Sequence, residues 1–249
     1  MHIPKTAGSS INNFFGNIFG SEYSLFHLET IQDWETLSDT YFQPYVYIAG
    51  HTPFPRVSKR LEGGQWRTFS VIRDPFDHLI SHISWVKNLV RTPRRFRNSP
   101  RDVQKLSRRL NEINFNDVDD VAKFFHSPLG LALSMFDNRQ VRYFSDPPDD
   151  EPATEKSFKD ALITTQNFTF VGVFERLKET IAYVVGNWFT GHAEFIPEFS
   201  HVNVYNPKVP NHSNLKDVLE PFFRYDCLLY QFLVERFKTT LDNNYEIGS

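Results

Sequence analysis

The stretch His2-Ile-Pro-Lys-Thr-Ala-Gly-Ser-Ser10 combines a lysine with small and hydroxyl-bearing residues directly before a helical pattern. Small residues let the backbone curl around a ligand, and N–H groups at a helix N-terminus favour phosphate or sulfate. The lysine precedes the glycine, so this is not a Walker A loop. A Ser-capped helix beside a surface lysine is the alternative. The predicted anion-binding residues are Lys5, Thr6, Ala7, Gly8, Ser9 and Ser10.

A second set of polar residues follows the short apolar run at 68–72. Arg73 comes directly after this run, and Asp74 and Pro75 suit the N-cap and first position of a helix. Ser81 lies about two turns into that helix. An arginine and a hydroxyl directed at one crevice suit a second phosphate. A local ion pair between Arg73 and Asp74 is the alternative.

His51 is the candidate general base. It follows the apolar run Tyr45–Ala49 and Gly50, so we expect it at the carboxyl end of a strand. A neutral imidazole can accept a proton near pH 7. The alternative is a histidine that hydrogen-bonds a loop carbonyl. The next residues to consider as a base are His201, Asp77 and Glu175.

The elements that must position these residues alternate between strands and helices. Apolar runs predict strands at 45–49, 68–72 and 168–173. Helical periodicity predicts helices near 9–20, 75–90, 118–125, 129–136, 158–165, 177–188, 215–223 and 228–237. Such alternation is typical of an α/β fold in three layers, with a central parallel sheet flanked by helices and ligands at the carboxyl ends of its strands.

The composition excludes several classes of protein. The 249 residues carry a net charge of −3, which argues against a generally basic nucleic-acid binder. A single cysteine, Cys227, excludes an internal disulfide and a cysteine zinc site. No apolar run reaches the roughly 20 residues of a membrane span. We therefore expect one domain over residues 1–249, with a cytoplasmic location and no nucleic-acid partner.

Two segments look irregular. Arg91–Arg109 contains seven arginines and Lys105 against only Asp102, a net charge of +7, and it also contains two prolines. Residues 146–155 are acidic and contain three prolines. We expect surface loops at both places. The basic segment is either a solvated flap or a lip that binds an acidic glycan.

Together the two polar strings resemble the sulfotransferases that use 3′-phosphoadenylyl sulfate (PAPS). Pro4-Lys-Thr-Ala-Gly-Ser-Ser10 is similar to that family's 5′-phosphosulfate loop, and Arg73-Asp-Pro-x-x-His-x-x-Ser81 is similar to its 3′-phosphate motif. Ala49-Gly-His-Thr-Pro53 resembles the stretch that carries the catalytic histidine of heparan sulfate 2-O-sulfotransferase. The resemblance covers most of residues 2–233. It points to the carbohydrate branch, which includes heparan sulfate 2-O- and 6-O-sulfotransferases and many bacterial proteins.

The resemblance implies a P-loop-like fold and a role for each matched residue. The loop at 5–10 would bind the 5′-phosphosulfate, while Arg73 and Ser81 would bind the 3′-phosphate. Lys5 would offset charge on the leaving phosphate oxygen, and His51 would act as base. PAPS would be the donor and 3′,5′-ADP (PAP) the product, with no metal. The implied reaction is sulfuryl transfer to a hydroxyl of a glycan or glycolipid; small alcohols and phenols are the second choice of acceptor.

The chain departs from this family pattern in two places. His78 stands where the family often has an arginine. Only Met1–Ile3 precede the loop, although the strand that feeds it is normally central in the sheet. A truncated reading frame, or a domain cut from a longer membrane-anchored protein, is therefore an alternative expectation.

Two other classes of function remain open. A P-loop kinase would need a lysine after the glycine and an acidic magnesium ligand on a later strand, and neither is clear in the sequence. A non-catalytic nucleotide- or glycan-binding module could use the same fold.

Overall fold

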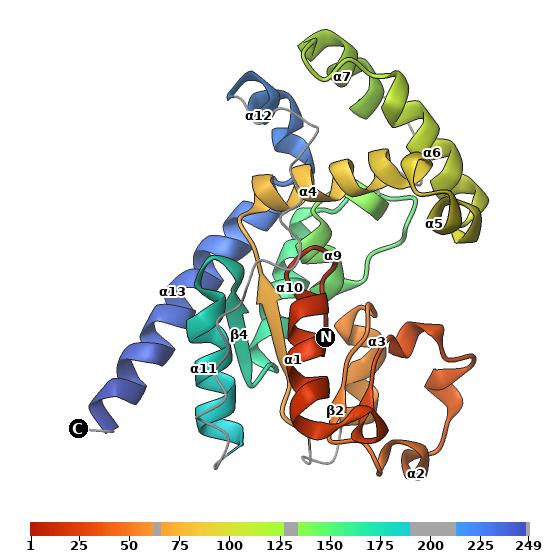
Figure 1. The fold of residues 1–249 in the computed structure, drawn as a ribbon. Helices are drawn as coiled ribbons and strands as arrows, with labels where there is room; N and C mark the ends of the chain where they lie inside the picture. Colours follow the sequence, from red (N-terminus) through yellow and green to blue (C-terminus); the bar gives the residue numbers. More distant parts are fainter. Residues whose placement is uncertain (62–65, 127–133, 190–212, 248–249) are drawn as a thin grey trace.

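The computed structural model describes residues 1–61, 66–126, 134–189 and 213–247. Within these ranges the chain combines many helices with short parallel strands, so the predicted mixture of α and β structure is present (Figure 1). The strands form two separate two-stranded parallel sheets rather than one central sheet. The reason is that no described strand lies between β2 and β3, and both strands of the first pair are very short.

The described helices follow the sequence pattern closely in places. α7 (Val118–Phe125) and α11 (Leu177–Trp188) have the predicted bounds. Asp74 caps α4 through Asp77 N (3.0 Å), and Pro75 is its first residue, as expected. The other helices are α1 (Gly8–Phe19), α2 (Asp39–Phe42), α3 (Phe54–Ser58), α4 (Pro75–Asn88), α5 (Pro93–Asn98), α6 (Arg101–Glu112), α9 (Arg139–Ser145), α10 (Glu155–Gln166), α12 (Ser213–Leu219) and α13 (Arg224–Ile247).

The second strand pair lies in the main hydrophobic core. β3 (Phe69–Ile72) and β4 (Phe170–Val173) pair in parallel along their whole length, with Phe69 opposite Phe170 and Ile72 opposite Val173. All four residues of β4 are buried, and α11 and α13 pack against this strand (Figure 1). Arg73 follows β3 directly, so a firmly packed strand positions it.

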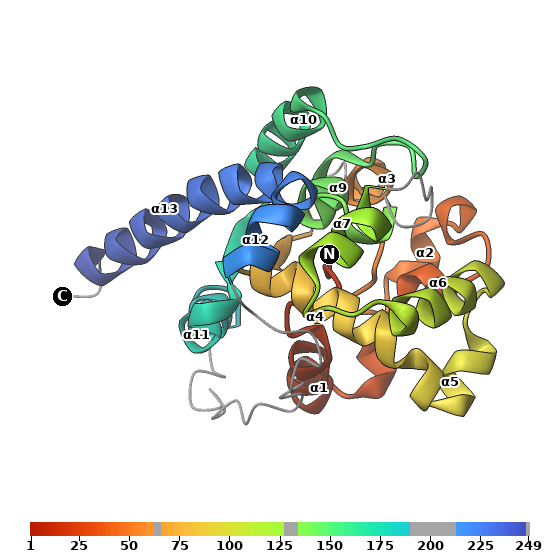
Figure 2. The ribbon, with the colours of Figure 1, turned by 90° about the horizontal axis from the view of Figure 1, so that it is seen from above.

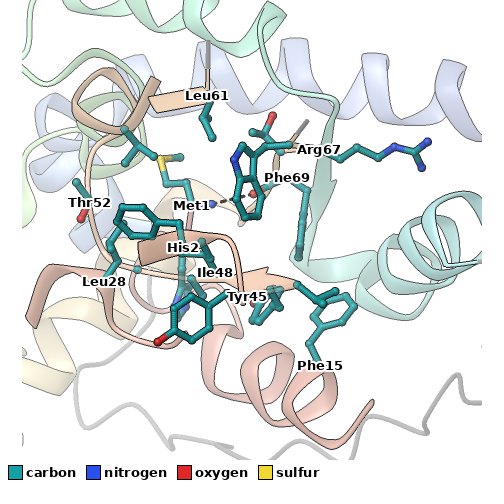
Figure 3. A pocket seen from close by; sticks show the side chains of 18 of the residues that line it. Met1, His2, Phe15, Leu28, Tyr45, Ile48, Thr52, Leu61, Arg67 and Phe69 are labelled. Carbon is teal, nitrogen blue, oxygen red and sulfur yellow. Dashed lines mark hydrogen bonds between the residues drawn. The ribbon is translucent and has the colours of Figure 1, made fainter. Parts of the chain in front are cut away.

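The first strand pair is shorter and lies beside a cavity. β1 (Ser24–Leu25) pairs in parallel with β2 (Tyr47–Ile48). A cavity of about 740 Å³, here called the inter-sheet cavity, is lined by residues of β2, β3 and α1 (Figure 3). The first two residues of the chain reach both strand pairs, because Met1 N donates to Phe69 O (3.1 Å) and His2 N donates to Gly50 O (2.9 Å).

The basic segment is helical, which corrects the prediction of a surface loop. Its two prolines do not interrupt the helices, because Pro93 is the first residue of α5 and Pro100 is the N-cap of α6. Leu106 and Leu110 of α6 are buried against α4. The charged residues therefore project from one side of an amphipathic helix, whose apolar side is fixed.

Residues 146–154 are irregular, as predicted, but they are tied to the core. The guanidinium of Arg142 is buried and pairs with Asp137 (2.9 Å). It also donates to Pro148 O (3.1 Å) and Glu151 O. These bonds attach the acidic segment to α9.

Other expectations fall partly or wholly outside the described ranges. The helix expected at 129–136 lies there in part, and His201 lies there entirely. The expected last helix is longer than predicted, since α13 reaches Ile247. Among the described helices, none combines the length and apolar character that a membrane crossing requires. Figure 2 shows α13 extending beyond the rest of the fold.

Candidate functional site

The loop before α1 has a strained backbone. Lys5 and Ala7 adopt positive φ values of 71° and 69°, a region that side-chain-bearing residues rarely occupy. Thr6 is buried, and its hydroxyl donates to Ile3 O (2.8 Å). Such strain costs about 1–3 kcal/mol per residue and persists only where the surroundings impose it.

Those surroundings are three side chains from other elements, each of which hydrogen-bonds a loop carbonyl. The side chains come from the segment after β2, from α4 and from the end of β3. The bonds are His51 Nδ1 with His2 O (2.9 Å), His78 Nε2 with Pro4 O (2.8 Å) and Arg73 Nη1 with Lys5 O (3.2 Å). The fold therefore brings the predicted residues His51 and Arg73 to the predicted loop.

The start of α1 differs from the prediction of a serine cap. The helix begins at Gly8, so Ser9 and Ser10 lie within its first turn. Ala7 is the N-cap, and no side chain caps this end, which leaves backbone N–H groups of the first turn available to an anion. Gly8 is required here, because a Cβ would lie 1.3 Å from the His2 ring.

The main chain of Arg73 is fixed by hydrogen bonds, but one nitrogen of its guanidinium group has no hydrogen-bond partner. The Gln140 side chain bonds both the N–H and the C=O of Arg73 (2.9 Å each). The guanidinium lies 4.4 Å from the centre of the Phe174 ring, and Arg73 Nε is buried with no hydrogen-bond partner. No ion pair joins Arg73 to Asp74 in the described part of the chain, so the local pair considered above does not form.

Positive charges gather around Lys5. Burial lowers the pKa of its ammonium, and the charges of Arg73 and Arg95 lower it further. Arg95 belongs to α5, so the basic segment contributes to the field at the loop. Arg95 also lines an open cavity of about 450 Å³, together with Trp85, Arg94 and Asn98. An anion bound at the loop would be attracted by these charges.

His51 has a defined tautomer. Because a carbonyl can only accept a hydrogen bond, the bond to His2 O places the proton on Nδ1 and leaves the lone pair on Nε2. The ring stacks on the His2 ring, with centroids 4.3 Å apart. Burial lowers the pKa of His51, and the backbone hydrogen bond to His2 partly opposes this. His51 therefore hydrogen-bonds a loop carbonyl, which was the alternative to a role as general base. Its Nε2 can still accept a proton, so the two roles are compatible.

The other candidate residues are placed less favourably. Both carboxylate oxygens of Glu175 are engaged, one by Asp74 N (2.9 Å) and one by the Tyr230 hydroxyl (3.0 Å), so it is a poor base. His78 is buried, and its pKa falls to about 3, mainly through desolvation, which makes it a neutral support for the loop. Ser81 lies one turn beyond His78 on α4 and is 9% exposed.

Sequence reasoning did not identify Gln140 and Asp226, the residues that fix the main chain of Arg73 directly or through a second hydrogen bond. The Asp226 carboxylate accepts the N–H groups of Gln140 (3.1 Å) and Val141 (2.7 Å), and so fixes the start of α9. Burial raises the pKa of Asp226 to about 7. Asp226 lies 86 residues from Gln140, so no sequence motif contains both. Asp and Gln are also common on protein surfaces, so neither residue type indicates a buried role.

Comparison with known proteins adds no family assignment. No protein-family model matches the chain, and no curated protein sequence gives a significant match. The function must therefore be argued from the geometry of the Lys5 loop, Arg73 and His51.

Proposed function

We propose that this protein transfers a sulfuryl group from PAPS to an acceptor hydroxyl. The observation that carries the proposal is the convergence of a strained, uncapped loop at Lys5 with Arg73, whose Nε is buried and has no partner. A buried polar atom without a partner is costly, and a bound anion would satisfy it. PAPS carries anionic groups on both sides of one nucleoside, and the loop and Arg73 offer two adjacent places for them.

The residues divide the chemistry between donor and acceptor. As the acceptor oxygen bonds sulfur, the bond from sulfur to the leaving phosphate oxygen breaks in line. The acceptor proton passes to His51 Nε2, and negative charge on the leaving oxygen is offset by Lys5 and the N–H groups at the start of α1. The products are PAP and a sulfate ester, and this scheme needs no metal ion.

The acceptor we propose is a glycan or glycolipid hydroxyl. The open cavity at Trp85, Arg94 and Arg95 lies on the Lys5 side of the molecule, as the electrostatic effect of Arg95 on Lys5 indicates. Arginines and an aromatic ring suit an acidic sugar, since the guanidinium groups pair with carboxylate or sulfate. The basic segment would then be a lip over the acceptor rather than a solvated flap.

The finer fold assignment also belongs to this proposal. In a P-loop-like, three-layer fold the strand that feeds the loop lies between its neighbours in one parallel sheet. Residues 1–2 already bond β3 on one side and the end of β2 on the other, and the inter-sheet cavity lies beside them. This arrangement supports a single sheet with a central strand leading into the loop.

Calorimetry with 3′,5′-ADP, 5′-ADP and ATP with Mg²⁺ tests the proposal. We expect 3′,5′-ADP to bind tightest, and Arg73→Ala to weaken it selectively. Loss of a buried charge contact costs about 2–5 kcal/mol, or roughly 30- to 5,000-fold in affinity. Arg67→Ala is the matched control, since Arg67 precedes the same strand at its other end and is exposed. Equal weakening of 3′,5′-ADP and 5′-ADP would refute the role of Arg73.

The same titration separates the alternatives. Tightest binding of ATP with Mg²⁺ would indicate a kinase. A module that only binds would retain the preference for 3′,5′-ADP but would transfer no labelled sulfate in a screen against a glycan panel.

A further inference from the structure

Three potential metal ligands meet beside the loop, and the proposed transfer reaction does not use two of them. His27 and Glu29 come from the connection after β1, and His51 comes from the segment after β2. One ligand atom from each of the three side chains lies within 4.8 Å of the others. His27 Nδ1 and Glu29 Oε1 are already 3.1 Å apart.

The cluster is held together by bonds to the backbone. Glu29 Oε2 accepts the N–H of His51 (2.7 Å), so the carboxylate is attached to the segment that carries the third ligand. The His51 ring donates from Nδ1 to His2 O (2.9 Å). Metal-bound histidines are commonly oriented in this way, with one ring nitrogen donating to a carbonyl and the other facing the metal.

We propose that His27, Glu29 and His51 bind a divalent transition-metal ion, with Zn²⁺ as the expected ion. Two imidazoles and one carboxylate form a three-ligand set that leaves a fourth tetrahedral position for water. Hard ions such as Mg²⁺ and Ca²⁺ prefer oxygen ligands, whereas imidazole nitrogen favours zinc and its neighbours. The set therefore selects the softer class of ion.

Binding requires only small movements of surface side chains. Ligand bonds of about 2.0–2.2 Å in a tetrahedron place ligand atoms roughly 3.3–3.6 Å apart. Separations of up to 4.8 Å must therefore shorten, whereas the 3.1 Å between His27 Nδ1 and Glu29 Oε1 is already short enough. His27 and Glu29 are exposed, with 57% and 28% of their side-chain surfaces accessible, and can rotate toward a bound ion. His51 is more buried and would supply the fixed ligand.

The metal site and the proposed base share one lone pair. An ion on His51 Nε2 would prevent this nitrogen from accepting a proton, so the bound ion would inhibit the transfer reaction. The site itself does not depend on that reaction, because it follows from the three side chains alone. Metal binding must therefore be measured directly, without an activity assay.

Cobalt spectroscopy provides that measurement. We expect Co²⁺ to bind the whole protein with one-to-one stoichiometry, to give the intense visible absorption of a four-coordinate site, and to be displaced by Zn²⁺. His27→Ala and Glu29→Gln should each weaken binding at least 10-fold. His126→Ala is the control, since His126 is exposed and is the C-cap residue of α7; it should leave the affinity unchanged.

Failure of Co²⁺ to bind would overturn the metal site, and so would either of two other results. One is an affinity that neither His27→Ala nor Glu29→Gln changes, and the other is an equal loss with His126→Ala. Glu29→Gln keeps an oxygen that can accept the His51 N–H, and thermal melting of each metal-free variant checks that the fold is intact. Failure of sulfate transfer would leave this inference untouched, while failure of cobalt binding would leave the transferase proposal untouched.

Discussion

The two pairs of parallel strands present opposite sides of the same site, and they are built very differently. β3 and β4 pair over four residues each, lie in the main core and are covered by α11 and α13. β1 and β2 pair over only two residues each, and β2, whose Tyr47 belongs to the same core, borders the inter-sheet cavity together with β3. Arg73 follows the first of these packed strands, whereas His51 follows the short strand beside the cavity.

This difference separates two requirements of the proposed transfer reaction. A nucleotide phosphate needs a rigid partner, and Arg73 is fixed by Gln140, which Asp226 fixes in turn. The proposed proton transfer needs a base at the right place, and His51 is held by hydrogen bonds to His2 O of the loop and to the Glu29 carboxylate. We therefore expect donor binding to depend on the β3/β4 side and turnover to depend on the β2 side.

The largest effect should come from His51→Ala, which tests this division directly. General-base catalysis is worth about 10²–10⁴ in rate. The variant should lose turnover on that scale while 3′,5′-ADP affinity stays nearly unchanged, as measured by labelled-sulfate transfer and calorimetry. Burial lowers the pKa of His51, so the wild-type rate should fall only at pH below the usual histidine range.

His126→Ala serves as the control for this substitution, because it removes an exposed imidazole at the C-cap of α7. It should retain wild-type turnover. If His51→Ala retained a tenth or more of the wild-type rate, the base would have to lie elsewhere.

A matched pair of phenylalanine substitutions compares the packing of the two sides. Phe170 on β4 and Phe42 on α2 are both buried, at 3% and 8% exposure, but Phe42 lines the inter-sheet cavity. Phe→Ala in a packed core costs about 3–5 kcal/mol. We expect Phe170→Ala to reduce the free energy of unfolding in urea by that much. Phe42→Ala should reduce it clearly less, because the Phe42 ring borders the cavity. Equal losses would show that the two sides are packed alike.

The sequence predicted the packed side better than the side with the cavity. The run at 68–72, Asp74 and Pro75 form a strand followed by a capped helix, because short-range hydrophobic pattern and capping chemistry decide both elements. The run at 45–49 forms only the two-residue strand β2. Its pairing depends on neighbours that are distant in sequence, which a local pattern does not contain.

Filling the inter-sheet cavity should reduce the difference in packing between the β3/β4 side and the β1/β2 side. Burial lowers the pKa of the Met1 amino group from 8.0 to about 6, so the charge on this group destabilises the fold fully below about pH 6, and this penalty disappears as pH rises to about 8. Extending the chain before Met1 with four residues of the Val/Ile/Thr type should raise the melting temperature, because it removes this charge and adds a strand beside β2 and β3.

A four-residue Gly/Ser extension is the matched control for that change. It also removes the buried charge, but it adds no strand-forming side chains to the cavity. The apolar extension should therefore melt higher than the polar one. Identical melting temperatures would show that the cavity does not accept a strand.

Measured per pH unit, the smallest effect concerns Asp226, whose carboxyl group supports Gln140. Its folded pKa of about 7 exceeds the ordinary aspartate value, so the folded state holds the proton more firmly. The stability that Asp226 contributes is therefore complete below about pH 4 and is lost as pH rises toward 7, by about 1.4 kcal/mol per pH unit. Asp226→Asn should remove this slope from the pH dependence of urea unfolding. A wild-type slope that the variant retains would place its origin in another group.

The candidate site shows where prediction from sequence ends. The residue types of the Lys5 loop, Arg73 and His51 were identifiable, since each follows an apolar run or precedes a helix. The support of the loop carbonyls by His78 was not, because its place in a helix equally suits a surface histidine. The approach of His27 and Glu29 to His51 depends on the pairing of β1 with β2, which no spacing in the sequence indicates.

The three loop carbonyls have a consequence for how this site can change. His51, His78 and Arg73 lie on three different elements but hold one strained loop, so the loss of any one alters the geometry that the other two stabilise. Substitutions at these positions should be non-additive, although the residues are distant in sequence. An evolving or engineered lineage would have to cross intermediates in which the loop is only partly supported, and libraries that vary the three positions together should reach new specificities that single-site scanning misses.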